Sequence, residues 1–267
     1  MLRTLKTAIR DALPRRYQVS LKFWYSKLRG DLEDEMALLP KLLNPSDRVI
    51  DIGANRGVYA YPLARLGARV ELFEPNPACA QILASWAAKQ PNVSLHAVAL
   101  SDHEGSAELQ IPVDATGVEH DASASIEKSG SGQFREQVVP LATLDSFQFR
   151  QVALIKIDVE GHEFRVIEGA QKTIASDKPA LLIEIEQRHN SRPITEVLKR
   201  VTDFGYEGFF MSQGHLRPLT EFDVSAHQIP GNLGGKSGTY INNFLFLHHS
   251  RLAGGEYNRL PGLDSLK

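Results

Sequence analysis

The stretch VIDIGANRGVYA, residues 49–60, surrounds one acid with apolar residues and then places two glycines on either side of an asparagine. The apolar run predicts a buried strand, and the glycines predict a sharp turn directly after it. A glycine at position 53 lets the backbone turn tightly and approach a ligand closely. We expect a helix to begin near Arg56 and to direct its first N–H groups at that ligand.

Outward from this stretch, apolar segments alternate with helical patterns. The main strands are expected at residues 48–54, 69–75, 93–100, 152–159, 180–186, 206–212 and 241–248. Strands that are apolar almost throughout and separated by helices indicate a mostly parallel sheet with helices on both faces. The sequence therefore predicts a doubly wound, Rossmann-like α/β fold.

One interruption of this alternation lies between the third and fourth main strands. Residues 106–113 and 136–144 read as an extra strand pair, and the chain between them is polar and rich in Gly and Ser. A loop of this length inside a compact domain is either functional or disordered. Residues 114–136 are therefore a candidate lid, although composition alone does not separate a lid from a disordered segment.

Composition and charge narrow the class of protein. The chain has 267 residues, 42% of them hydrophobic, and a formal net charge of -2, which indicates a globular protein with no overall attraction to nucleic acid. A single cysteine, Cys79, and the lack of a long uncharged apolar run favour the cytoplasm. We expect a helical extension over 1–46, a main domain over 47–249 and a tail over 250–267.

The first 30 residues carry an excess of positive charge. They contain eight Lys or Arg and one acid, Asp11, which gives a local net charge of +7. Apolar residues recur at helical spacing within this segment. It is either a basic surface helix that packs on the main domain or a peripheral contact with the inner face of a membrane.

Polar residues at the ends of the first three strands are candidates for a cofactor site, because ligands of such folds bind at the carboxyl ends of the strands. The turn DIGANRG departs from the dinucleotide fingerprint, and a carboxylate beside it suits a ligand that bears an ammonium and a sulfonium. An acid that follows the second strand can accept the hydroxyls of a ribose. The candidates are Asp51, Gly53, Asn55, Gly57, Glu74, Ser101 and Asp102.

The fourth main strand, LIKIDVEGHE, places Lys156, Asp158 and Glu160 on one face. Because an unpaired buried charge is costly, we expect Lys156 to pair with Glu184 of the next strand. Asp158 and Glu160 should emerge at the ligand-binding edge. His162 is expected at the surface, in the first turn of the following helix.

These motifs, in this order, resemble the FkbM family of S-adenosylmethionine-dependent class I methyltransferases. The resemblance covers roughly residues 40–248, and DVEGHE after DIGANRG is its most specific part. It implies a seven-stranded sheet with a reversed last strand, and S-adenosylmethionine as cofactor. It places the residues of the glycine turn around the methionine end, Glu74 at the ribose, and Ser101 with Asp102 at the adenine.

The resemblance also implies methyl transfer to a hydroxyl group, on a sugar, a glycolipid or a natural product. The candidate catalytic residues are Asp158, Glu160 and His189, each able to position the acceptor or take its proton. No motif indicates a metal. Two alternatives remain: an NAD-dependent oxidoreductase, which Asn55 and Asp51 disfavour, and a cofactor-binding interaction module without catalysis.

Overall fold

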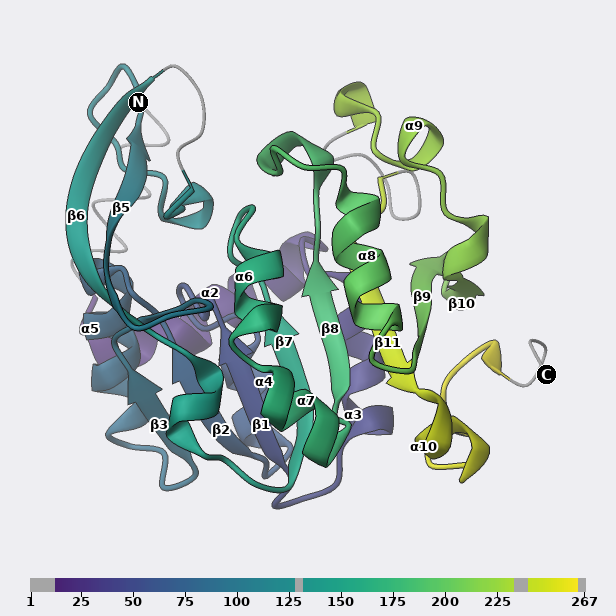
Figure 1. The fold of residues 1–267 in the computed structure, drawn as a ribbon. Helices are drawn as coiled ribbons and strands as arrows, with labels where there is room; N and C mark the ends of the chain where they lie inside the picture. Colours follow the sequence, from purple (N-terminus) through teal and green to yellow (C-terminus); the bar gives the residue numbers. More distant parts are fainter. Residues whose placement is uncertain (1–12, 128–131, 233–239, 264–267) are drawn as a thin grey trace.

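A computed structural model describes residues 13–127, 132–232 and 240–263 of the chain. Its centre is a sheet of eight strands in the order β10-β9-β11-β8-β7-β1-β2-β3 (Figure 1). The bounds of these strands are β1 Arg48–Ile52, β2 Arg69–Phe73, β3 Val93–His96, β7 Val152–Ile157, β8 Ala180–Glu184, β9 Tyr206–Ser212, β10 His215–Pro218 and β11 Asn243–His248.

The predicted fold class is confirmed. Strands β3, β2, β1, β7 and β8 run parallel, and β11 is antiparallel to both β8 and β9, which is the expected reversed last strand. The sheet has one edge strand more than expected, because β10 forms an antiparallel hairpin with β9. In β10 the single buried residue is Leu216, so this strand carries almost no apolar pattern.

The expected extra strand pair is also present, as β5 Gly105–Val113 and β6 Gln133–Ala142. They pair antiparallel, and β4 Ala99–Leu100 joins β6 in parallel to complete a second, three-stranded sheet. The predicted third strand, 93–100, is therefore divided between the two sheets. Figure 1 shows β5 and β6 rising beyond the edge at which β7 and β8 end.

Helices cover both faces of the main sheet. Buried apolar residues of α2 to α5 pack with Val49 on one face, and those of α6 to α8 pack with Ile50 on the other. The α-helices are α2 Arg15–Arg29, α3 Leu39–Leu42, α4 Ala60–Arg65, α5 Pro77–Ala87, α6 Glu163–Glu168, α7 Gln171–Asp177, α8 Ile194–Thr202, α9 Val224–His227 and α10 His249–Ala253. Short 3₁₀ turns are η1 Asp34–Leu38, η2 Asp121–Ser123, η3 Leu144–Phe147, η4 Gln187–His189, η5 Leu219–Glu221 and η6 Pro230–Asn232.

The first residues of two helices, α4 and α5, lie near the ligand-binding edge of the main sheet. The helix that was expected near Arg56 begins four residues later, at Ala60, so the turn before it is longer than predicted. At the end of β2, the side chain of Asn76 accepts a hydrogen bond from Ala78 N and Pro77 occupies the first turn of α5. This cap fixes the direction in which the chain leaves β2.

Candidate functional site

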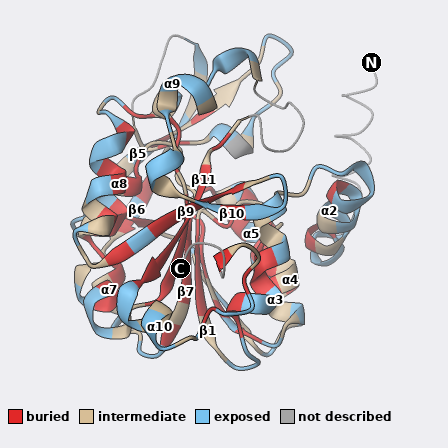
Figure 2. Cartoon of the chain, turned by 90° about the vertical axis from the view of Figure 1, so that its right-hand side faces the viewer, coloured by how far each residue is buried: buried red, intermediate tan, exposed pale blue. Residues whose placement is uncertain are grey.

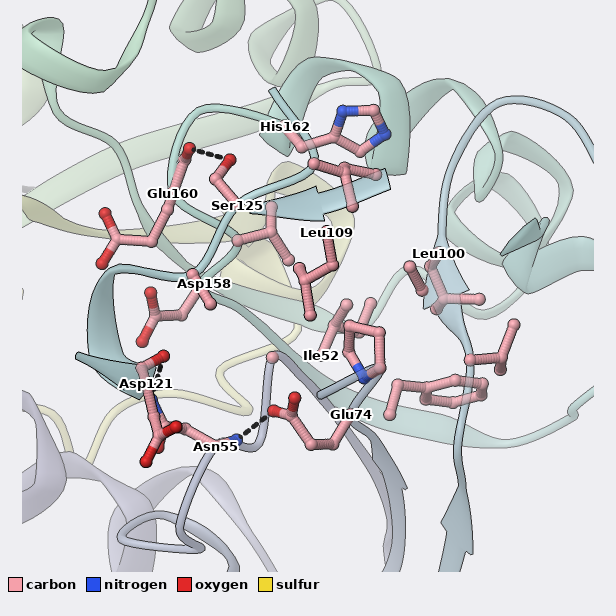
Figure 3. Close-up of a pocket in the computed structure, with 18 residues that line it drawn as sticks. Ile52, Asn55, Glu74, Leu100, Leu109, Asp121, Ser125, Asp158, Glu160 and His162 are labelled. Carbon is pink, nitrogen blue, oxygen red and sulfur yellow. Dashed lines mark hydrogen bonds between the residues drawn. The ribbon is translucent and has the colours of Figure 1, made fainter. Parts of the chain in front are cut away.

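A pocket opens at the carboxyl ends of β1, β2 and β7 and beneath the segment that connects β5 to β6 (Figure 3). Its volume, including the opening to solvent, is about 590 Å³. The lining residues come from six places in the chain and are Ile52, Gly53, Asn55, Phe73, Glu74, Pro75, Val98, Ala99, Leu100, Leu109, Asp121, Ala124, Ser125, Ile126, Asp158, Val159, Glu160 and His162. Of the predicted site residues, five line it: Gly53, Asn55, Glu74, Asp158 and Glu160.

At Gly53 the glycine turn lies close to the end of β7, the fourth main strand along the chain. Its φ is +79°, and a Cβ atom at this position would lie only 1.8 Å from the carbonyl oxygen of Asp158. Asp158 N also donates to Ile52 O over 3.0 Å. A side chain at position 53 would therefore push the two strand ends apart, which explains the glycine.

Asn55 also has a left-handed backbone, with φ +49°, a conformation that asparagine tolerates better than most residues. Its backbone N donates to Glu74 Oε2 over 2.6 Å (Figure 3), and Asn76 N donates to Glu74 Oε1 over 2.7 Å. The carboxyl group of Glu74 is thus fixed between two turns at the wall of the pocket. Burial raises its pKa to about 7 despite these hydrogen bonds.

The segment between β5 and β6 covers the pocket and supplies lining residues that the sequence did not single out. Arg56 Nε donates to Asp121 Oδ2 over 3.0 Å, and Asn76 Nδ2 donates to Asp121 Oδ1 over 3.1 Å. Farther along, Ser125 Oγ donates to the carbonyl oxygen of Glu160 over 2.7 Å. The length and polarity of the loop had indicated that this segment could cover the site, but they did not indicate the individual contacts.

Asp51 does not line the pocket. It lies on the face of β1 opposite to its neighbours Ile50 and Ile52, and it is buried near Lys156. Burial raises the pKa of Asp51 to about 7. Among the described residues its Oδ2 atom has no hydrogen-bond partner.

The expected pairing of Lys156 is wrong in its partner. Lys156 Nζ lies 2.8 Å from Asp158 Oδ2, two residues farther along the same strand end. Glu184 instead accepts a hydrogen bond from Asn242 Nδ2 over 2.7 Å, and contributes to Lys156 only as a nearby charge. The reason is that Asp158 follows the last residue of β7, so its side chain can turn back over the ammonium group.

Besides Asp51, three other predicted cofactor residues lie outside the lining. Gly57 packs beneath the turn, where an added Cβ would lie 2.8 Å from a methyl of Val19. Ser101 Oγ and Asp102 Oδ1 are 3.1 Å apart, and hydrogen bonds from His103, Ser101 and Arg165 outweigh the opposing effect of burial and lower the pKa of Asp102 to about 2. The apolar residues just before them, Val98 to Leu100, form the wall of the pocket.

His162 is not at the surface as expected, because only 6% of it is exposed. Its Nε2 lies 3.0 Å from Ser101 Oγ and its Nδ1 lies 2.7 Å from Glu127 Oε1. The hydrogen bond from His162 lowers the pKa of Glu127. The imidazole thereby connects the end of the third strand, the start of α6 and the covering segment.

A second, narrow hollow adjoins the pocket; its space of about 160 Å³ includes the opening to solvent, and it is too narrow to admit a water molecule. It is lined by Asp158, Glu160, Gly161, Glu163, Glu184, Glu186 and His189. Asp158 and Glu160 therefore line both hollows, and the three predicted catalytic residues all meet here. Gly161, with φ +102°, lets the chain pass against η4, since a Cβ there would lie 2.3 Å from the carbonyl oxygen of His189.

In this second hollow, His189 Nε2 lies 2.9 Å from Glu160 Oε2. The Glu160 carboxylate raises the pKa of His189. Arg188 forms a bidentate contact with Glu186. Its Nε donates to Glu186 Oε2 over 2.7 Å, and its Nη2 donates to Glu186 Oε1 over 2.9 Å. An imidazole beside a carboxylate can take up a proton and hold it as part of an ion pair.

Comparison with known proteins places these motifs in a family. Residues 51–207 match the family model described as the methyltransferase FkbM domain. The hexuronic acid methyltransferase AglP of Haloferax volcanii is 26% identical over 176 residues, which are 64% of this chain and 69% of that protein.

Solved structures of methyltransferases are similar to the chain to different degrees. A methyltransferase FkbM from Methylobacillus flagellatus KT has a TM-score of 0.51 and 14% identity, over 76% of this chain and 44% of that chain. A precorrin-6y C5,15-methyltransferase from Geobacter metallireducens GS-15 has a TM-score of 0.44 and 12% identity, over 80% of this chain and 87% of that chain. The matched family model spans more than half of the sequence, from Asp51 in the glycine turn to β9. The chain belongs to the FkbM family of S-adenosylmethionine-dependent methyltransferases, as its motifs predicted.

Proposed function

We propose that this protein transfers a methyl group from S-adenosylmethionine to a hydroxyl group of a sugar-containing acceptor. The observation that carries the proposal is the pair of adjoining hollows, which share Asp158 and Glu160 as a common wall. A methyl transfer requires that the donor sulfur and the acceptor oxygen lie on opposite sides of the methyl carbon, in line with it. The sugar acceptor is supported by the similarity of the chain to the hexuronic acid methyltransferase AglP of Haloferax volcanii.

The residues of the larger pocket fit the nucleoside end of this cofactor. Glu74 presents a carboxyl group that can accept hydrogen bonds from ribose hydroxyls. The apolar wall of Val98, Ala99 and Leu100 suits the face of an adenine base. In this proposal Gly53 and Asn55 face the methionine part, while Ser101 and Asp102 lie behind the apolar wall at the adenine.

Asp51 and Gly57 have a supporting role in the same proposal. Asp51 is too deeply buried to touch a ligand directly, with 1% of it exposed, but its carboxyl group lies beneath the turn. Gly57 lets the turn pack against Val19. Both residues therefore shape the glycine turn without contacting the ligand.

The acceptor chemistry is assigned to the side of the pocket at which Asp158, Glu160 and His189 meet. When bound, S-adenosylmethionine supplies a methyl group activated by a positively charged sulfur. The acceptor oxygen forms a bond to that methyl carbon as the bond between the carbon and sulfur breaks. The hydroxyl proton passes to a base. Glu160 and His189 form the candidate base pair, because they lie 2.9 Å apart and neither is tied to a lysine. Asp158, held by Lys156, positions the acceptor.

The cofactor assignment is tested by isothermal titration with S-adenosylhomocysteine. We expect Glu74→Gln to weaken binding by about tenfold, the cost of a charge-assisted hydrogen bond. Glu108→Gln, at an exposed position on β5, is the matched control and should bind as the unchanged protein does. Equal affinity in both variants would remove Glu74 from the site.

The base assignment is tested by transfer of labelled methyl groups to sugar and glycolipid extracts. His189→Asn and Glu160→Gln should each lower kcat by about 10²- to 10⁴-fold, with His215→Asn as the exposed control. Because Glu160 raises the pKa of His189, the neutral base predominates only above the usual value for histidine. Activity should rise with pH through that raised value, and a flat profile would exclude His189 as base.

A further inference from the structure

Helix α2, residues Arg15–Arg29, packs on the outside of the fold, beside α5 and α4 (Figure 2). Its inner side is fixed to the domain. Val19 is fully buried against Gly57 and Leu83, Ser26 is buried, and the ring of Phe23 lies 4.9 Å from that of Tyr61. The orientation of the helix about its own axis is therefore defined, and so is the face that it presents to solvent.

The outward face is apolar and aromatic. Tyr17, Leu21, Trp24 and Leu28 follow one another at spacings of four, three and four residues, which places them in one line along the helix. Their exposed fractions are 49%, 46%, 48% and 87%. We call these four residues the outer stripe of α2. A surface helix normally shows its polar side to water, so an apolar line on the outside needs a partner.

The cations of α2 lie at different distances from the outer stripe. Arg16 and Lys27, eleven residues apart, lie beside it, whereas Arg15, Lys22 and Arg29, which repeat every seven residues, lie farther round the helix, toward the buried side. The helix contains no acid. The nearest one, Asp31, pairs with Arg29 at 2.7 Å. An exposed apolar and aromatic line on a helix with five cations and no acid suits the interface of an anionic membrane.

We infer that the outer stripe of α2 is a docking surface for an anionic lipid bilayer. In the bound state the four apolar side chains enter the boundary between headgroups and acyl chains. Arg16 and Lys27 reach the lipid phosphates, and the other three cations of the helix add to its attraction to the anionic surface. Aromatic residues such as Trp24 and Tyr17 favour that depth. Within the described residues no helix combines the length and the apolar character that crossing a bilayer requires.

The inference rests on residues 15–29 and not on the whole basic segment that the sequence singled out. Residues 1–12 of that segment lie outside the described residues. Charge complementarity decides between partners. A second copy of this chain would bring five more cations to the same helix, and the two helices would repel each other. An anionic bilayer neutralises these charges.

Sedimentation of the full chain with lipid vesicles tests the inference without any methyl transfer. We expect binding to vesicles of phosphatidylcholine mixed with phosphatidylglycerol and little binding to phosphatidylcholine alone, with loss at high salt. Lys22→Gln together with Lys27→Gln should weaken binding by about fivefold for each cation removed. Leu21→Ser together with Leu28→Ser should also abolish most of it. Val138→Ser together with Lys172→Gln, exposed positions on β6 and α7, is the control and should bind normally.

Tryptophan fluorescence gives a second readout. The chain has two tryptophans, and Trp86 is buried in α5, so a change on vesicle binding reports Trp24. We expect its emission to shift to shorter wavelength with anionic vesicles. Absence of binding at low salt, or binding that neither double variant on α2 weakens, would overturn the inference. So would sedimentation equilibrium showing a dimer that the Leu21 and Leu28 changes dissociate, because the stripe would then face a second copy.

Discussion

Lys156 Nζ lies 2.8 Å from Asp158 Oδ2, so a lysine with 1% of its surface exposed holds a carboxylate at the wall of both hollows. The ammonium also lies 4.9 Å from the centre of the Tyr59 ring. Burial alone would lower the pKa of Lys156, but the carboxylates of Asp158, Glu33 and Glu184 outweigh it and raise that pKa. Lys156 therefore stays charged and fixes Asp158.

Lys156→Met is expected to destabilise the protein by about 3–5 kcal/mol, because it leaves several carboxylates buried without their counter-charge. Urea unfolding at neutral pH measures this change. Lys199→Met is the control, since Lys199 pairs with Asp203 at an exposed position where an ion pair contributes only about 0–1 kcal/mol. Equal losses of stability in the two variants would contradict the central role of Lys156.

Gly53→Ala is expected to disturb both stability and cofactor binding. The added Cβ meets the carbonyl oxygen of Asp158 and also occupies a left-handed backbone, with φ +79°. Gly30→Ala separates the two effects, because Gly30 has φ +70° but no atom within 4 Å of an added Cβ. The control should lose about 1–2 kcal/mol in thermal unfolding. Gly53→Ala should lose more and also lose affinity for S-adenosylhomocysteine, and identical behaviour would mean that the close approach does not matter.

The fold could be predicted from the sequence because its signals are local. Each parallel strand is an apolar run, and each binding turn directly follows one, as Gly53 follows β1 and Glu74 follows β2. The Asn76 cap is likewise a feature of neighbouring residues. Strand β10 was missed for the same reason, since one buried leucine makes no pattern.

The contacts across the site could not be predicted in this way. Asp121 meets Arg56 across 65 residues, and Ser125 meets Glu160 across 35. Such pairs depend on how the second sheet packs over the first, which no local pattern encodes. The direction of Asp51, by contrast, is encoded locally, because the alternation of side chains along β1 already places it opposite to Ile50 and Ile52.

Arg56→Met is expected to loosen the segment that covers the pocket. The pair with Asp121 is mostly buried, with side-chain exposures of 15% and 9%, so its loss should cost about 1.5–3 kcal/mol locally. Faster amide hydrogen exchange over residues 114–127 and faster release of S-adenosylhomocysteine are the measurements. Arg135→Met is the control, because Arg135 pairs with Glu119 near solvent on the outer side of the same segment. If both variants release the ligand equally fast, Arg56 does not hold the segment between β5 and β6 over the pocket.

The stability of the ligand-free protein is expected to fall as pH rises through neutrality. Burial raises the pKa values of Asp51, Glu74 and Glu163 to about 7, well above those of the unfolded chain. Between the unfolded and the folded values the native state binds more protons, so the free energy of unfolding decreases with pH. This stability is fully present below the unfolded pKa values and is lost as pH passes about 7. Thermal melts at increasing pH measure the trend, and Glu74→Gln should flatten it, whereas Glu108→Gln should not. A melting temperature that rises across this window would show that these carboxyl groups are ionised in the folded protein.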